Sequence, residues 1–286
     1  MSTVETSPDK PQVEDDLDRL RAAKAFIFDM DGVLYRGKQS LPGVQDIFNA
    51  LTVRGIPFLL ATNNSMATPA TYVQRMAEMG VTITAEEVQT SATATRDFLK
   101  DELAPDARIL PVGMPALAEQ LSDGTSFRMI GDDEPETDAD AVVVGLDLTF
   151  TYEKLRRATA AIVNGAKFVA TNADTTLPNE SGFQPGAGSI VASIAAASGQ
   201  QPIVVGKPEP LMMQKGVEQL GTDAGHTVMV GDRLDTDIAA GHRAGLMTAL
   251  VLTGVAKRED LASAAVLPDY VFADLPALMQ GIVGHG

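Results

Sequence analysis

Short apolar runs alternate with longer amphipathic stretches along most of the chain. The first run, Ala25–Phe28, is too short for a helix and stops at Asp29, so it predicts a fully buried strand. A strand that is apolar on both faces favours a parallel sheet. Residues 44–51 instead repeat apolar side chains at positions i, i+3, i+4 and i+7 and stop before Gly55, which predicts a helix that packs one face inward.

The same alternation continues in the rest of the chain on either side of a long middle region. We expect further strands at residues 56–61, 203–205, 227–230, 248–252 and 270–272, and helices at residues 69–80, 208–220, 236–244, 258–264 and from residue 275 onward. A strict alternation of strands and helices is typical of an α/β fold with an open, parallel, Rossmann-like sheet that helices cover on both faces. Ligands of such folds bind beyond the carboxyl ends of the strands.

The middle region carries an alternation of its own. We expect strands at residues 109–112, 127–130, 141–144 and 168–170, and helices at residues 114–121, 153–164 and 189–197. The interpretation is a second α/β domain, residues 86–202, inserted into a core made of residues 21–85 and 203–286. The acid-rich residues 1–20 are expected to be a disordered tail, with a short helix at its end as an open alternative.

Composition narrows the class of protein. Of 286 residues, 45% are hydrophobic and 21% are charged, as in ordinary soluble globular proteins, and the absence of cysteine excludes disulfides, thiolate zinc sites and cysteine nucleophiles. The formal charge of −16 argues against nucleic acid or an anionic membrane as a partner, so an anionic substrate needs local cations. No apolar run is long enough to span a bilayer, and the first residues do not resemble a secretory signal, so we expect a cytoplasmic protein.

Polar clusters follow four of the predicted core strands. They are residues 29–32 (Asp-Met-Asp-Gly), residues 62–64 (Thr-Asn-Asn), Lys207, and Asp232 with Asp235 and Asp237. Each alone is typical of an ordinary turn. Because the carboxyl ends of parallel strands share one edge of the sheet, turn chemistry explains the four together poorly.

The combined set suits phosphoryl chemistry. Clustered carboxylates resist ionisation unless a cation lies between them, and ligation by oxygen alone indicates Mg²⁺. The cation, Lys207 and the donors of residues 62–64 would neutralise the phosphoryl oxygens. The spacing of Asp29 and Asp31 allows one carboxylate to attack phosphorus while the other transfers protons.

The chain resembles the NagD-like phosphatases of the haloacid dehalogenase superfamily from about residue 25 onward. The matching stretches are Phe-Ile-Phe-Asp-Met-Asp-Gly-Val-Leu at residues 26–34, Thr-Asn-Asn-Ser at residues 62–65, Val-Gly-Lys-Pro at residues 205–208 and Gly-Asp-Arg-Leu-Asp-Thr-Asp at residues 231–237. True dehalogenases lack an acid at the position of Asp31, which disfavours cleavage of carbon–halogen bonds. The insertion resembles the large α/β cap of this branch.

This resemblance implies a role for each candidate residue. Asp29 would be the nucleophile that becomes an aspartyl phosphate, and Asp31 the general acid and base. Mg²⁺ would bind the carboxylates of Asp29 and Asp232 and the main-chain carbonyl of Asp31. The phosphate site would consist of Thr62, Asn63, Asn64 and Lys207. Asp237 fits the trailing acidic position that supports the metal or its waters, a role that Asp235 could share, and the two are not ranked.

The resemblance leaves the substrate open. Residues 170–178 resemble the cap loop that faces the active site, and Leu177 stands where the pyridoxal phosphatase branch has a histidine, so we expect a general phosphomonoesterase. Its substrate would be a small ester such as phosphoglycolate, glycerol phosphate, a sugar phosphate or a nucleotide, with nitrophenyl phosphate as an artificial one. Dimers formed through the cap are also implied. A phosphotransferase on the same fold and a catalytically silent binding or scaffold protein remain alternatives.

Overall fold

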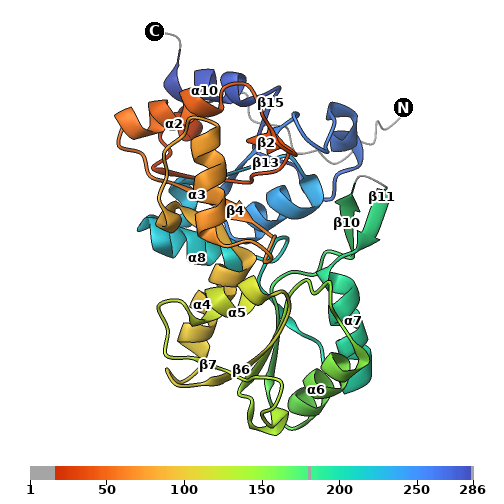
Figure 1. Ribbon diagram of the computed structural model, residues 1–286. Helices are drawn as coiled ribbons and strands as arrows, with labels where there is room; N and C mark the ends of the chain where they lie inside the picture. Colours follow the sequence, from red (N-terminus) through yellow and green to blue (C-terminus); the bar gives the residue numbers. More distant parts are fainter. Residues whose placement is uncertain (1–16, 180–181, 285–286) are drawn as a thin grey trace, which may run out of the picture.

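Two parallel sheets organise the molecule, for which a computed structural model describes residues 17–179 and 182–284 (Figure 1). The six-stranded core sheet has the order β15-β14-β13-β1-β4-β5, and the five-stranded cap sheet has the order β12-β9-β8-β6-β7. The core strands are β1 (Ala25–Phe28), β4 (Phe58–Thr62), β5 (Val88–Thr90), β13 (Thr227–Gly231), β14 (Met247–Val251) and β15 (Tyr270–Phe272). The cap strands are β6 (Arg108–Val112), β7 (Arg128–Met129), β8 (Ala141–Val144), β9 (Lys167–Ala170) and β12 (Ile203–Val204). The α/β fold with an open parallel core sheet is therefore confirmed.

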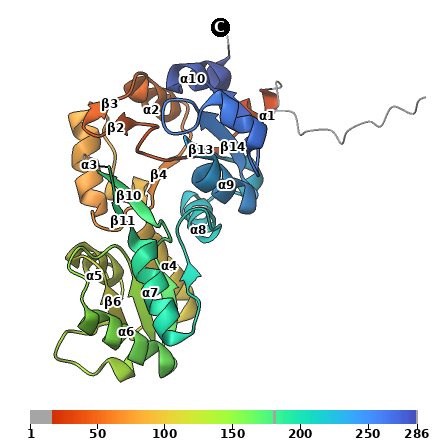
Figure 2. The same ribbon diagram turned by 90° about the vertical axis from the view of Figure 1, so that its right-hand side faces the viewer.

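Helices cover both sheets, as Figures 1 and 2 show. Around the core sheet lie α2 (Val44–Val53), α3 (Pro69–Glu78), α8 (Leu211–Leu220), α9 (Ala239–Arg243) and α10 (Leu275–Val283), with the short α1 (Asp18–Arg21) beside α10. Around the cap sheet lie α5 (Pro115–Ser122), α6 (Tyr152–Val163) and α7 (Ala187–Ser198). Between the two groups, α4 (Ser91–Glu102) packs against both α5 and α8.

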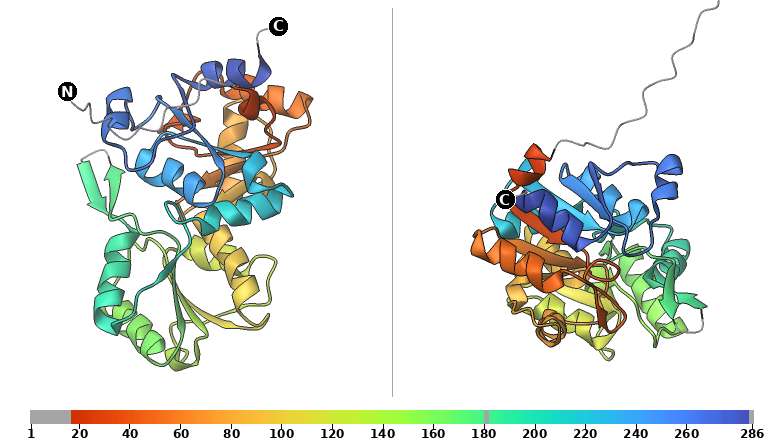
Figure 3. Two further views of the ribbon diagram at one scale, coloured as in Figure 1. Left: turned by 180° about the vertical axis from the view of Figure 1, so that it is seen from behind. Right: turned by 90° about the horizontal axis from the view of Figure 1, so that it is seen from above.

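Shorter elements complete the chain. Two antiparallel hairpins pair β2 (Tyr35–Arg36) with β3 (Gln39–Ser40) and β10 (Thr176–Asn179) with β11 (Gly182–Pro185). Figure 3 shows the β10–β11 hairpin leaving the cap toward the core. Short segments of 3₁₀ or π helix are η1 (Ala85–Glu87), η2 (Glu136–Asp138), η3 (Ala224–His226), η4 (Leu234–Ile238) and η5 (Arg258–Ser263).

Local sequence explains the elements that position the site. All four residues of β1 are buried, as expected for a central strand covered on both faces. Helix α3 begins with Pro69, whose missing N–H costs nothing at that position. Asp274 caps the N-terminus of α10, because its carboxylate accepts a hydrogen bond from the Ala277 N–H, 2.9 Å away.

The structure moves both predicted domain boundaries. Strand β5 falls within the residues assigned to the insertion, but it pairs with β4 in the core sheet. Strand β12 falls within the residues predicted for the core, but it pairs with β9 in the cap sheet. Of the expected tail, residues 1–16 lie outside the described residues, whereas Leu20 in α1 is fully buried, so order begins before residue 21. Residues 236–244 and 258–264 also depart from regular α-helix, because η4 precedes α9 and η5 is a 3₁₀ helix.

One apolar cluster joins the two sheets. It includes Ile27 and Leu59 of the core sheet, Ile109 and Val143 of the cap sheet, and Leu99 of α4. Each of these side chains is at most 1% exposed. The core and the cap are therefore packed through a shared hydrophobic interior rather than through polar contacts alone. Among the described residues, no helix is both long and apolar enough to cross a membrane.

Candidate active site

The carboxyl edge of the core sheet collects the predicted polar residues. Asp29 follows β1, Thr62 ends β4 and Asp232 follows β13. Lys207 reaches the same edge from the segment between β12 and α8, and Asp237 lies in η4. The chain thus brings together residues that are up to 208 positions apart, because parallel strands with helical crossovers all point the same way.

Lys207 lies at the centre of this group. Its Nζ lies 2.5 Å from Asp29 Oδ1 and 2.7 Å from Asp237 Oδ1, and the side chain is only 3% exposed. Burial alone would lower the pKa of Lys207, but the carboxylates of Asp237 and Asp29 outweigh it and raise the pKa above its ordinary value. The lysine is therefore a fixed positive charge beside the Asp29 carboxylate.

The three carboxylates around Lys207 carry more negative charge than this one lysine can balance. Carboxylate oxygens of Asp29, Asp232 and Asp237 lie within 4.8 Å of one another. Burial, together with the charges of neighbouring carboxylates, raises the pKa of Asp29 to about 7, in spite of Lys207, and raises the pKa of Asp232 to about 6. A cation bound among these groups would remove the repulsion that disfavours their ionised forms.

The contacts of Asp232 leave one oxygen for such a cation. Its Oδ2 accepts a hydrogen bond from the Val255 N–H at 2.7 Å, whereas its buried Oδ1 has no hydrogen-bond partner in the described part of the chain. Asp237 Oδ2 accepts bonds from the N–H groups of Asp232 and Arg233, at 3.2 and 3.1 Å. Because buried oxygens are seldom left unpaired, the donor set fits a hard divalent ion.

The sequence left the choice between Asp235 and Asp237 open, and the structure separates them. Asp237 is buried and bonds Lys207, as described above. The side chain of Asp235 is 71% exposed and pairs with Arg233, 3.0 Å away. Asp235 therefore lies outside the acidic cluster.

A cavity of about 270 Å³ opens beside Asp29. Of the predicted residues, its lining includes Asp29, Asp31, Thr62, Asn63, Asn64, Lys207 and Asp237. The predicted cap loop contributes Asp174, Thr176 and Leu177. The cavity thus lies between the core edge and the cap loop, where a substrate would meet both.

Asp31 faces this cavity next to basic and aromatic side chains. Burial raises the pKa of Asp31, and the positive charge of Arg75 partly offsets that rise. The Arg75 guanidinium lies over the ring of Tyr35, 4.3 Å from its centre. Sequence reasoning missed Arg75 and Tyr72, although they lie three residues apart in α3 and so share one face of that helix.

The residues after β4 form a turn that is held by its own side chains. Thr62 Oγ1 accepts a hydrogen bond from the Asn64 N–H at 3.2 Å, and Asn64 Oδ1 accepts one from the Met66 N–H at 2.9 Å. The Asn63 side chain instead bonds the backbone of Lys207 and the carboxylate of Asp174. The turn therefore presents Thr62 and Asn64 to the cavity, while the Asn63 amide is occupied.

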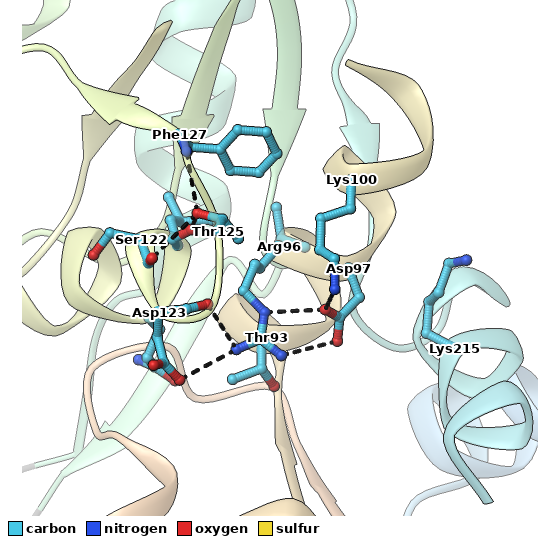
Figure 4. Close-up of polar contacts among 12 residues, drawn as sticks. Thr93, Arg96, Asp97, Lys100, Ser122, Asp123, Thr125, Phe127 and Lys215 are labelled. Atoms are coloured by element: carbon cyan, nitrogen blue, oxygen red, sulfur yellow. Dashed lines mark hydrogen bonds and ion pairs between the residues drawn. The ribbon is translucent and has the colours of Figure 1, made fainter. Parts of the chain in front are cut away.

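A larger cavity of about 880 Å³ lies elsewhere, between α3, α4, α5 and α8. Figure 4 shows Arg96 in this region, bonded to Asp97 and Asp123, with Lys100 next to Asp97. Lys215 also lines it and pairs with Asp101 and Glu218. The lining of this larger cavity contains none of the residues that the sequence predicted for the site, which gather instead beside Lys207.

Comparisons with known proteins identify the family. Residues 26–124 match the haloacid dehalogenase-like hydrolase family, and residues 204–278 match a second family of the same hydrolase type. The acid sugar phosphatase of Staphylococcus saprophyticus is 40% identical over 257 residues, which cover 90% of this chain and 97% of that protein.

Solved structures agree with the sequence matches. The p-nitrophenyl phosphatase of Archaeoglobus fulgidus is 31% identical and superposes with a TM-score of 0.84, covering 90% of this chain and 98% of that one. NagD of Escherichia coli is 33% identical with a TM-score of 0.80, covering 88% and 97% of the two chains. The residues at the edge of the core sheet and the inserted second sheet are those expected from the resemblance, and the relatives point to the same family. The chain therefore belongs to the haloacid dehalogenase-like hydrolases as a NagD-like phosphatase.

Proposed function

We propose that the protein hydrolyses small phosphomonoesters with Mg²⁺ and forms an aspartyl phosphate on Asp29. The observation that carries this proposal is the position of Lys207, whose Nζ contacts both Asp29 and Asp237 at the end of a cavity. One carboxylate oxygen is thereby held beside a buried positive charge that can also reach a phosphoryl oxygen. This arrangement suits attack on phosphorus rather than metal storage or simple charge balance.

Two steps complete the reaction. A carboxylate oxygen of Asp29 attacks phosphorus, the bond from phosphorus to the ester oxygen breaks, and Asp31 gives its proton to the leaving oxygen. Asp31 then takes a proton from water, whose oxygen attacks phosphorus and breaks the bond to Asp29. Inorganic phosphate leaves and both carboxylates return to their initial states. The raised pKa of Asp31 suits a group that must carry a proton in the first step.

Mg²⁺ is supported by the donor set of the site. The carboxylates of Asp29 and Asp232 and the main-chain carbonyl of Asp31 would hold it, and Asp237 would support it from the adjoining turn. When bound, the ion neutralises charge on the phosphoryl group and the carboxylates. Thr62 and Asn64 would donate hydrogen bonds to the phosphate.

The substrate class we propose is a small sugar phosphate. The Staphylococcus saprophyticus relative is named an acid sugar phosphatase, and the cavity of about 270 Å³ admits only a compact leaving group. Arg75, Arg233 and Lys207 line the cavity, and together they supply the local positive charge that a phosphate ester needs in a chain of net charge −16.

We also propose that the reaction takes place in the cytoplasm and that the protein forms a dimer through the cap. We propose neither nucleic acid nor a membrane as a partner.

The test is phosphate release across a panel of sugar phosphates, glycerol phosphate, phosphoglycolate and nucleotides, with p-nitrophenyl phosphate as the artificial substrate. We expect release that requires Mg²⁺, stops with a chelator and is fastest for a sugar phosphate. Transfer of the phosphoryl group to an added alcohol in preference to water would favour a phosphotransferase. Ligand binding without turnover of any ester would contradict an enzymatic role.

A further inference from the structure

The side-chain amide of Asn63 forms three hydrogen bonds, two with the backbone of Lys207 and one with Asp174 in the cap loop. Its Oδ1 accepts a hydrogen bond from the Lys207 N–H at 2.9 Å, and its Nδ2 donates to the Lys207 carbonyl at 2.8 Å. The second Nδ2 hydrogen goes to Asp174 Oδ2 at 3.1 Å. One amide thus holds both main-chain groups of the lysine, as a neighbouring strand would.

The backbone of Asn63 is held just as closely. Its carbonyl accepts hydrogen bonds from Asn172 Nδ2 at 2.6 Å and from Ser91 Oγ at 2.7 Å. Ser91 begins α4, through which the chain passes from the core sheet to the cap, and Lys207 lies on the segment that returns from β12 to α8. Asn63 therefore bonds both linking segments, and Asn172 adds a bond from the cap loop after β9. Asn63 itself is half-buried, but its partners Ser91, Asn172 and Lys207 are buried, and hydrogen bonds to buried groups are costly to leave unmade.

Gly206 shows how close the approach is. A Cβ atom at this position would lie 2.7 Å from Asn63 Oδ1 and 2.5 Å from the Thr171 carbonyl oxygen, both inside contact distance. Only glycine lets the strand that leads to Lys207 come near enough for the Asn63 amide to reach the lysine backbone.

The geometry points to Asn63 as a positioning residue that acts through Lys207, rather than as a ligand of the phosphate. The inference rests on the proposed function, because Lys207 is the residue that faces Asp29. Without the amide, the Lys207 N–H and carbonyl lose the side-chain hydrogen bonds that Asn63 gives them, and Nζ can leave the position between Asp29 and Asp237. A displacement of about 1 Å at a reacting group can cost on the order of a hundredfold in rate.

The test is a double-mutant cycle of Asn63→Ala and Lys207→Ala in Mg²⁺-dependent hydrolysis of p-nitrophenyl phosphate. We expect Asn63→Ala alone to lower kcat about a hundredfold with KM changed less than about threefold, since the substrate's contacts remain. In the Lys207→Ala background, Asn63→Ala should lower kcat by less than about threefold more, because the backbone that Asn63 holds no longer carries the lysine side chain. Equal effects in both backgrounds, or a change confined to KM, would overturn the inference in favour of direct phosphate binding.

A second measurement does not depend on activity. Deuterium exchange of the segment that ends at Lys207 should be faster in Asn63→Ala than in the wild type, because the amide that protects the Lys207 N–H is missing. The matched control is Asn164→Ala, on the cap surface, whose side-chain amide donates to the Ala160 carbonyl at the end of its own helix. It should leave both kcat and this exchange unchanged. Unchanged exchange in Asn63→Ala would contradict the inference even if the protein hydrolysed no ester, whereas an inactive wild type with faster exchange in this variant would contradict only the proposed function.

Discussion

Asp237 is the side chain that ties the acidic cluster together. It contacts Lys207 through one oxygen and accepts two main-chain N–H bonds through the other, which fixes both the lysine and the turn carrying Asp232. In Asp237→Asn the amide oxygen can still accept the main-chain N–H bonds, but the amide NH₂ then faces Lys207, which loses one of its two carboxylate partners. Groups that orient metal ligands in this way commonly affect metal affinity by ten- to a hundredfold.

Asp237→Asn should therefore raise the Mg²⁺ concentration needed for half-maximal activity by about ten- to a hundredfold. The matched variant is Asp235→Asn, two residues away and exposed, whose Mg²⁺ requirement should stay near that of the wild type. Titration of activity against Mg²⁺ for the two variants checks this. A larger effect of Asp235→Asn than of Asp237→Asn would show that the assignment is reversed.

Gly254 lets the loop after β14 approach the same site. A Cβ atom at this position would overlap the carboxylate of Asp232, whose Oδ2 accepts the bond from Val255. We expect Gly254→Ala to weaken Mg²⁺ activation about tenfold or more, since it displaces a carboxylate of the acidic cluster. Activity at saturating and limiting Mg²⁺ measures this. An unaltered Mg²⁺ requirement would mean that Asp232 does not bind the metal.

At the scale of elements, a buried carboxylate joins β8 to α6 in the cap. Asp147 Oδ2 lies 2.6 Å from Lys154 Nζ in the first turns of α6, and Asp147 Oδ1 accepts bonds from the N–H and hydroxyl of Thr149. Burial would raise the pKa of Asp147, but these donors outweigh it and lower the pKa below its ordinary value of 3.8. The ionised form is thus preferred in the native state.

This preference gives the cap a defined sensitivity to acid. A lowered native pKa contributes stability that is fully present above pH 3.8 and is lost as the pH falls through the lower native value. The Asp147→Asn variant should therefore be less stable than the wild type at neutral pH. The difference in stability should shrink below pH 3.8. Urea unfolding at a series of pH values measures the difference. A gap that widens in acid would contradict the assignment.

The sequence predicted the elements whose burial pattern is simple. Runs such as Ala25–Phe28 are apolar on both faces, and the polar residues that follow them mark the carboxyl edge, which is why most of the candidate site could be found. Helix α4 was not predicted because Ser91, Thr93 and Thr95 are buried together with its apolar residues, which obscures the helical repeat of apolar positions. The short β5 contains buried Gln89 and Thr90 and gives no strand pattern either.

Contacts between distant segments could not be predicted in the same way. Nothing near Asn63 in the sequence indicates that its amide bonds a residue 144 positions away. The choice of Asp237 over Asp235 likewise depends on the π-type turn η4, which turns one carboxylate inward and the other toward solvent. Both features arise from tertiary packing rather than local propensity.

At the scale of the whole molecule, the shared apolar cluster makes the core and cap interdependent. Leu99 of α4 is fully buried in the cluster that also contains Leu59 of the core sheet and Val143 of the cap sheet. Cutting such a side chain leaves a cavity next to both sheets. The proposed core and cap domains should therefore lose stability together.

Leu99→Ala should lower the free energy of unfolding by about 2–5 kcal/mol, as expected for a buried leucine. Deuterium exchange should show reduced protection in strands of both sheets, measured at β4 and β8. Exposed Val163, which is 66% accessible on α6, provides a control, since Val163→Ala should change stability by less than about 0.5 kcal/mol. Loss of protection in one sheet alone would show that the two parts unfold independently.

The most direct measurement is of the covalent intermediate itself. Acid quenching of the enzyme during turnover of a phosphomonoester with Mg²⁺, followed by mass spectrometry of its peptides, should find a phosphoryl group on Asp29. The group should be absent in Asp29→Asn and when Mg²⁺ is withheld. A phosphoryl group on another residue, or rapid hydrolysis by Asp29→Asn, would contradict the account.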